Sequence, residues 1–178
     1  MFSASELFKG QAMPKSDQGA FVNRYKVIPR TLIFITKGDA VLLLKGAPDK
    51  RLWANRYNGI GGHIERSEDV LNAAKRELWE ETGLRASDLW LCGTVLVDAS
   101  DDIGIGLFVF RGDYETGELV ESHEGQLEWI KVEDIDQFPL ADDLKILLPR
   151  VLKMKTGEQP FSGRSFYDNQ EQLQLVFG

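Results

Sequence analysis

The sequence predicts an α+β sandwich, because strand-like segments lie on both sides of a central helix and a second helix follows near the end. The strand-like segments share apolar and β-branched residues, bounded by turn-forming residues. They are TLIFIT, AVLLLKG, LWLCGTVLVDA, IGIGLFVFRGDY, GELVE and LEWIKVEDI. Lys37-Gly38-Asp39 and Ser100-Asp101-Asp102 predict tight turns between neighbouring strands. PFSGRSFYD and QLQLVF predict a terminal hairpin.

The central helix is predicted between Ser67 and Gly83. Ser67 is a suitable N-cap, and Glu68 and Asp69 are favourable at the positive end of the helix. Gly83 can end the helix in the left-handed conformation. The second helix is predicted over residues 142–155, where apolar residues recur at helical spacing, with a local disturbance at Pro149.

The length of 178 residues suits one domain. Residues 1–20 show no persistent periodicity, and the strand pattern begins at Arg30. We therefore expect an N-terminal extension over residues 1–29 and a single domain over residues 30–178.

Composition limits the possible partners and location. The net charge of −7 argues against a nucleic-acid polymer as partner. The lone Cys92 has no partner for an internal disulfide, which favours a reducing compartment. No apolar run reaches transmembrane length, and the N-terminus lacks a basic-then-apolar signal pattern. We expect a soluble, cytoplasmic protein that does not associate with membranes.

Three glutamates of the central helix indicate a metal site. Glu77, Glu80 and Glu81 fall within one arc of about 100° on a helical projection, and the apolar residues of the helix fall on or beside that arc. Carboxylates that face the core repel one another and lose hydration unless a cation compensates them. Oxygen ligands without a Cys and His cluster favour Mg²⁺, with Mn²⁺ as a substitute, over zinc.

The segment GHIERSEDVLNAAKRELWEETGL, residues 62–84, resembles the Nudix hydrolase signature at every fixed position. These positions are Gly62, Glu68, Arg76, Glu77, Leu78, Glu80, Glu81, Gly83 and Leu84. The resemblance implies a Nudix-type α/β/α sandwich with a mixed β-sheet and the signature loop-helix-loop. It also implies hydrolysis of a diphosphate linkage in a nucleoside diphosphate joined to another group, the reaction for which bound metal ions can stabilise the leaving oxygens.

The resemblance assigns roles to the matching residues. Glu77 and Glu81 are expected to bind metal, and Glu80 is expected to share that work or to act in water activation. The Gly61 carbonyl completes the metal site, and Arg76 orients the glutamates unless it is a solvated surface arginine. A further carboxylate is expected from ESHEGQLEWI. Glu124, five residues before Trp129, is favoured over Glu121 and Glu128, with a solvated loop glutamate as the alternative.

The substrate is less well defined by the sequence. YNGIGGHIE resembles the W-N-G-x-G-G-K segment of MutT-like oxidised-purine nucleoside triphosphatases, in which Asn58 would bind the base. Asp142 and Asp143 match paired aspartates that read the base edge in that branch, although Leu140 replaces the stacking tryptophan. Asn58 could instead form a turn, and the aspartates could instead cap the second helix.

Two further residues are expected near the phosphates. His63 stands where lysine is frequent, and it can still donate to a phosphate. Lys45 ends a strand that points towards the signature, beside a loop that carries Trp53, Lys50, Arg51 and Arg56.

The sequence thus predicts Mg²⁺-dependent cleavage of a nucleoside triphosphate, including oxidised purine nucleotides, to a nucleoside monophosphate and pyrophosphate. The alternatives are an ADP-ribose or nucleotide-sugar diphosphatase and a non-catalytic nucleotide-binding module. The partner is a small-molecule nucleotide. The oligomeric state is left open, a homodimer included.

Overall fold

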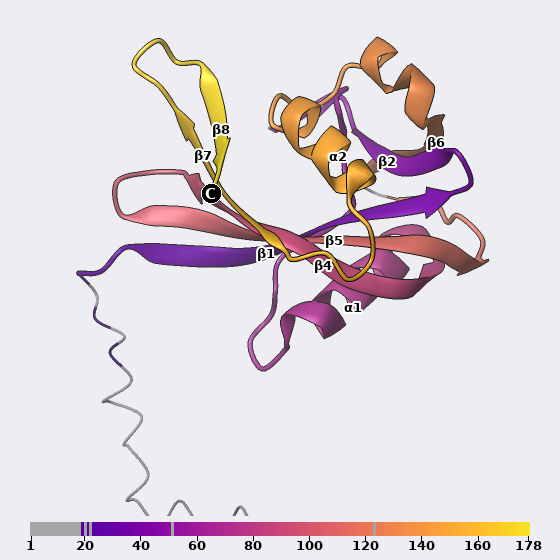
Figure 1. The fold of residues 1–178 in the computed structure, drawn as a ribbon, viewed down its shortest axis with the longest axis horizontal. Coiled ribbons are helices and arrows are strands. Elements are labelled where there is room, and N and C mark those ends of the chain that lie inside the picture. The colour runs from indigo at the N-terminus through magenta and orange to yellow at the C-terminus, as the bar shows by residue number, and fades with distance from the viewer. Residues whose placement is uncertain (1–18, 20, 22, 51, 123) are drawn as a thin grey trace, which may run out of the picture.

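The computed structural model describes residues 19, 21, 23–50, 52–122 and 124–178. Most of the predicted N-terminal extension, and Arg51 of the basic loop, lie outside these residues. The described strands form an eight-stranded sheet (Figure 1). They are β1 (Lys26–Lys37), β2 (Ala40–Gly46), β3 (Tyr57–Asn58), β4 (Leu84–Asp98), β5 (Ile103–Gly117), β6 (Gly125–Lys131), β7 (Phe161–Tyr167) and β8 (Leu173–Phe177).

The sheet is mixed, as predicted. Its hydrogen-bonded order is β3-β2-β1-β5-β4-β7-β8, and β6 also pairs with β2. The pairs β1–β5 and β4–β7 are parallel, whereas the predicted hairpins β1–β2 and β7–β8 are antiparallel. The first strand begins at Lys26, so the expected division at residue 30 falls inside β1.

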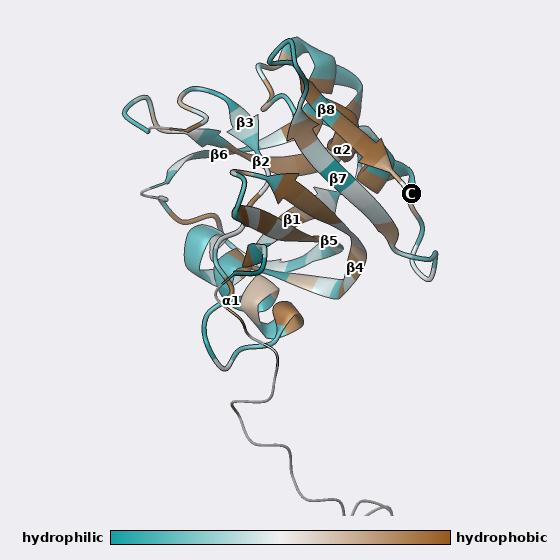
Figure 2. Ribbon diagram, turned by 90° about the vertical axis from the view of Figure 1, so that its left-hand side faces the viewer, coloured by the Kyte–Doolittle hydropathy of each residue, from teal (hydrophilic) through white to brown (hydrophobic). Residues whose placement is uncertain are grey.

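Two helices cover opposite faces of this sheet (Figure 1). Alternate residues of β1 point to opposite faces, as expected for a strand. Leu32 and Phe34 join the core beneath α2 (Leu144–Lys153), and Ile33 and Ile35 join the core beneath α1 (Val70–Thr82). Figure 2 shows these apolar strands between the two helices. The α/β/α sandwich is therefore confirmed.

The segment before α1 is held between two strands that separate from each other. β1 and β2 pair only near their turn, from Ile35–Leu42 to Lys37–Ala40. Beyond that point β3 pairs with β2, and Ile60 and His63 form bridges with β1. The chain thus crosses from one strand to the other, which fixes the loop that leads into α1.

Both ends of α1 have specific caps. The predicted N-cap Ser67 is wrong: Asp69 accepts hydrogen bonds from the backbone N–H of Leu71 and Asn72, each at 3.0 Å. A carboxylate at this position satisfies helix N–H groups that have no partner within the helix. Gly83 ends the helix with φ of 70°, as predicted, because glycine tolerates the left-handed conformation.

Three other predictions need correction. GELVE is not a strand: β5 ends at Gly117, and Val120 N–H instead donates to the Thr82 carbonyl at the end of α1. LEWIKVEDI is a strand only to Lys131 and continues as the 3₁₀ helix η2 (Val132–Gln137). The second helix begins at Leu144, two residues later than expected, and Pro149 lies inside it. None of the helices among the described residues has the length and apolar character needed to cross a membrane.

Candidate active site

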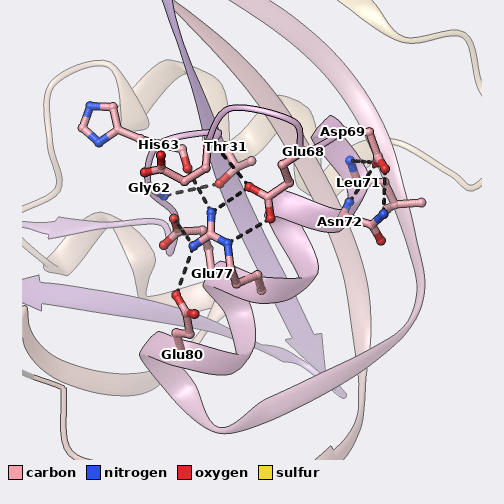
Figure 3. Close-up of polar contacts among 11 residues, drawn as sticks. Thr31, Gly62, His63, Glu68, Asp69, Leu71, Asn72, Glu77 and Glu80 are labelled. Atoms are coloured by element: carbon pink, nitrogen blue, oxygen red, sulfur yellow. Dashed lines mark hydrogen bonds and ion pairs between the residues drawn. The ribbon is translucent and has the colours of Figure 1, made fainter.

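Arg76 is the centre of a carboxylate network on α1. Its Nε and Nη2 donate to the two carboxylate oxygens of Glu68 at 2.9 and 3.0 Å, the geometry of a bidentate pair. Nη1 donates to Glu77 at 2.8 Å and to Glu80 at 3.0 Å. Figure 3 shows these three glutamates around the one guanidinium. The pKa of Arg76 is raised by these hydrogen bonds, first by its donation to Glu68.

The same guanidinium also fixes the loop before the helix. Nη2 donates to the backbone carbonyl of His63 at 3.1 Å. The Gly62 N–H donates to the Thr31 hydroxyl of β1 at 3.3 Å, and the Thr31 N–H donates to the Gly62 carbonyl at 2.9 Å. The loop and helix are therefore joined by side-chain contacts in addition to the continuous chain.

Gly62 is required by the close approach of Glu77. A Cβ built on Gly62 would lie 2.5 Å from both carboxylate oxygens of Glu77, closer than a side chain tolerates. The Glu77 side chain is only 12% exposed. The loop backbone and the Glu77 carboxylate thus occupy a space that only glycine leaves open.

Glu81 is the least compensated carboxylate of the helix. Its Oε2 is buried and has no hydrogen-bond partner among the described residues. Burial, followed by the charge of Glu77, raises the pKa of Glu81 to about 7. The Gly61 backbone and the Lys50 charge act in the opposite direction but do not cancel the effect.

The prediction that all three signature glutamates face the core is wrong for Glu80. Its side chain is 56% exposed and contacts Arg76 from the outer side of the helix. The contrast has a physical origin: Arg76 provides a partner for Glu77 and Glu80, whereas Glu81 has, within the described ranges, no cationic hydrogen-bond partner for its buried Oε2.

The donor set fits a hard divalent cation, although the carboxylates do not converge on one point. Within the part of the chain that the structure describes, no three His, Cys, Asp or Glu side chains are grouped as metal ligands. The partnerless Glu81 oxygen beside Glu77 is nevertheless the arrangement that a cation relieves. Glu77, Glu81 and the Gly61 carbonyl provide the oxygen donors that Mg²⁺ and Mn²⁺ prefer.

Glu124 lies on the loop just before β6. Its carboxylate forms an ion pair with Lys50 of the loop between β2 and β3. Glu128, the alternative that sequence reasoning ranked lower, accepts a hydrogen bond from the Tyr57 hydroxyl at 2.9 Å. Burial and this contact raise the pKa of Tyr57 to about 12. Both carboxylates therefore have a partner, and the side chain of Glu124 is 51% exposed.

The base-reading candidates lie on neighbouring segments. The Tyr57 N–H donates to the Pro139 carbonyl, and the Ala141 N–H donates to the Tyr57 carbonyl, each at 2.9 Å. These bonds align Asn58 with the segment that carries Asp142 and Asp143. Asn58 Oδ1 accepts from Gly59 N–H at 2.8 Å, as the turn-forming alternative requires.

The two aspartates differ in their surroundings. Asp142 pairs with Arg56 at 3.0 Å and with Lys145 at 2.9 Å, and hydrogen bonding to Lys145 leads the effects that lower its pKa. Asp143 makes no side-chain capping bond to α2, and its Oδ1 is buried without a partner among the described residues. Burial raises the pKa of Asp143.

Lys45 and His63 are placed less directly. Lys45 Nζ lies 5.7 Å from the centre of the Tyr57 ring, on the strand next to β3. The His63 ring points away from the Arg76 network (Figure 3), while its backbone supports that network.

Sequence reasoning missed two ionic partners. Glu68 was given no role beyond the helix end and its place in the signature, yet it forms the bidentate pair with Arg76. The fixed position of Glu68 in the signature was the feature of the sequence that could have indicated this pair. Lys50 was grouped with other basic loop residues, and nothing in the sequence pattern singled it out as the partner of Glu124.

Comparison with known proteins identifies the family of the chain. The chain matches the NUDIX domain family over residues 26–151. It is 32% identical to the oxidized purine nucleoside triphosphate hydrolase of Danio rerio over 130 residues, 70% of this chain and 80% of that protein. The enzyme of the same name from Mus musculus is 30% identical over 148 residues, 80% of this chain and 88% of that protein.

A solved structure, the MutT protein of Bacillus halodurans, superposes with a TM-score of 0.72. It is 27% identical, and the match covers 85% of this chain and 97% of that protein. The signature helix, the sheet between two helices and the family match lead to one assignment. The chain belongs to the Nudix family of hydrolases.

Proposed function

We propose that this chain is a Mg²⁺-dependent nucleoside triphosphate diphosphohydrolase that releases a nucleoside monophosphate and pyrophosphate. The observation that carries the proposal is the buried, partnerless carboxylate oxygen of Glu81 beside Glu77. Such a pair is costly without a cation and becomes favourable when a cation binds. Mn²⁺ is the expected substitute.

The residues of the site have different roles in metal binding and catalysis. Glu77, Glu81 and the Gly61 carbonyl hold the metal, with Glu124 as the ligand contributed by the opposite loop. When bound, the metal supplies charge neutralisation at phosphate oxygens and a lowered pKa of bound water. Glu80 shares in metal binding or in water activation. Arg76 is a positioning residue because it reaches the metal only through the carboxylates that it orients.

We further propose a purine nucleotide, including oxidised purines, as the substrate. Asn58 and Asp143 are the base-reading residues, supported by their alignment across the Tyr57–Ala141 hydrogen bond. The buried Oδ1 of Asp143 has an unmet hydrogen-bonding capacity that a base edge can satisfy. Asp142 contributes less to base recognition because its carboxylate is already paired with Arg56 and Lys145. Lys45 and His63 contact the phosphates, and the protein works in the cytoplasm on small-molecule nucleotides.

A substrate panel tests this proposal. Purified protein is incubated with Mg²⁺ and nucleoside triphosphates, oxidised purine triphosphates, ADP-ribose or a nucleotide sugar, and products are separated by ion-exchange chromatography. We expect kcat/KM to be highest for a purine triphosphate, with pyrophosphate as product. Preference for ADP-ribose or a nucleotide sugar would refute the substrate assignment, and the absence of any turnover would favour a binding module.

The base assignment has its own prediction. Asp143→Asn should reduce kcat/KM for the preferred purine by about 10-fold or more, since a buried hydrogen bond to the base contributes about 1–3 kcal/mol. Asp142→Asn is the matched control, with a smaller effect because its ion pairs face solvent. Equal losses for both variants on purine and pyrimidine substrates would show that neither residue reads the base.

A further inference from the structure

Lys50 is the ionic partner of Glu124, the carboxylate expected to join the metal site from the loop before β6. Its ammonium group pairs with Glu124, and its side chain is 32% exposed while that of Glu124 is 51% exposed. Neither residue belongs to the signature helix. This ion pair is separate from the Arg76 network, whose guanidinium nitrogens bind Glu68, Glu77, Glu80 and the His63 carbonyl.

Backbone hydrogen bonds bring the two side chains together. The Ala47 N–H donates to the Glu124 carbonyl at 3.2 Å, and the Lys50 N–H donates to the Ala47 carbonyl at 3.1 Å. Gly46 of β2 is paired with Gly125 of β6 at the end of the same ladder. The loop of Lys50 and the loop of Glu124 are therefore fixed to each other by main chain, so their ion pair does not depend on the metal site.

The field of Lys50 also reaches the signature helix. The positive charge of Lys50 lowers the pKa of Glu81, whereas burial and the charge of Glu77 raise it. The ion pair with Glu124 is the contact that carries the inference, because a divalent ion bound to Glu124 would meet the Lys50 ammonium at the same carboxylate. An ammonium group and a divalent cation at the same carboxylate repel each other, so the two compete for Glu124.

We propose that Lys50 is a positioning residue that holds Glu124 in the metal-free protein and competes with the divalent cation for that carboxylate. The inference rests on the proposed function, since it takes Glu124 as a metal ligand. Metal binding exchanges the partner of Glu124 and releases the Lys50 ammonium towards solvent. Lys50 therefore weakens binding of metal to the nucleotide-free protein.

Metal titration of the nucleotide-free protein tests this directly. Free Mn²⁺ is measured by electron paramagnetic resonance for the wild type, Lys50→Gln, Glu124→Gln and the double variant. Lys131→Gln is the matched charge control, because Lys131 pairs with the exposed Glu133 at 3.7 Å. We expect Lys50→Gln to tighten Mn²⁺ binding by about two- to fivefold, the strength of a partly exposed ion pair. In the Glu124→Gln background the tightening should be smaller.

Equal tightening in both backgrounds would overturn the proposal, because Lys50 would then act only through its general field. Weaker Mn²⁺ binding by Lys50→Gln would also overturn it. Glu81→Gln separates this inference from the proposed function. If Glu81→Gln binds Mn²⁺ as tightly as the wild type while the Lys50–Glu124 coupling persists, the assigned metal site fails and the Lys50 inference stands. If the wild type binds no Mn²⁺, both fail.

Discussion

Replacing Glu81 by glutamine should stabilise the metal-free protein at neutral and alkaline pH. The folded chain buries the Glu81 carboxylate next to Glu77 and raises its pKa from 4.5 to about 7. Between these two values the folded protein retains a proton that the unfolded chain releases. Stability therefore falls as pH rises through this window and is constant above it. Glutamine removes the titration.

The size of the effect follows from the shift. One pKa unit corresponds to 1.36 kcal/mol, so a shift from 4.5 to about 7 costs the wild type about 3 kcal/mol at pH 8. At pH 5 most of the folded molecules carry the proton, and the same relation leaves a difference of about 1 kcal/mol. The difference in the free energy of unfolding between Glu81→Gln and the wild type should thus be about three times as large at pH 8 as at pH 5.

Urea denaturation in the presence of a chelator measures this difference. Free energies of unfolding are determined at pH 5 and pH 8 for the wild type, Glu81→Gln and Glu80→Gln. Glu80→Gln removes the same charge from the exposed side of α1 and should change stability by less than about 1 kcal/mol. Added Mn²⁺ should stabilise the wild type more than Glu81→Gln. A variant no more stable than the wild type at pH 8, or an equal difference at both pH values, would refute the reasoning.

Two further substitutions test the support of the site. Arg76→Met should lower the free energy of unfolding by about 3 kcal/mol in urea denaturation, because it leaves the Glu77 carboxylate, 12% exposed, without its cation. Arg76→Lys should be intermediate, because it keeps the charge but not the planar set of donors. Wild-type stability of Arg76→Met would contradict this role. Gly62→Ala should weaken Mn²⁺ binding at least 10-fold, as its Cβ displaces the Glu77 carboxylate. Gly38→Ala is the control for a destabilised backbone away from the site, because its φ of 61° disfavours alanine while its Cβ meets nothing within 4 Å. Equal metal affinities of the two variants would show that Glu77 is not held by the contact with Gly62.

Sequence reasoning succeeded where one local signal decides the structure. Gly83 ends α1 because a left-handed residue is needed there, and Lys37-Gly38-Asp39 separates two strands that pair as a hairpin. It failed at Ser67 because hydroxyl and carboxylate candidates follow one another in the sequence. Asp69 has the extended backbone of an N-cap, with φ of −88° and ψ of 161°, whereas Ser67 has φ of 72°. Periodicity defines the helix but not which of several capping residues meets its N–H groups.

The candidate site was predictable only in part for a similar reason. Helical projection groups Glu80 with Glu81, but it does not include the position of the sheet, which buries one and leaves the other in solvent. The pair Arg76–Glu68 spans eight residues across a loop, and Lys50–Glu124 joins loops 74 residues apart. Such contacts depend on how β1 and β2 separate around residues 57–63, which no local pattern records.

The distribution of charge explains why one carboxylate dominates the expected metal affinity. Arg76 is shared by Glu68, Glu77 and Glu80, so each of these carboxylates keeps a cation when no metal is present. Lys50 does the same for Glu124. Glu81 alone among these glutamates has a buried oxygen without a partner, and it gains most when a divalent cation arrives. The protein can therefore fold with its other carboxylates already compensated, while the cost concentrated at Glu81 is recovered as binding free energy by the metal.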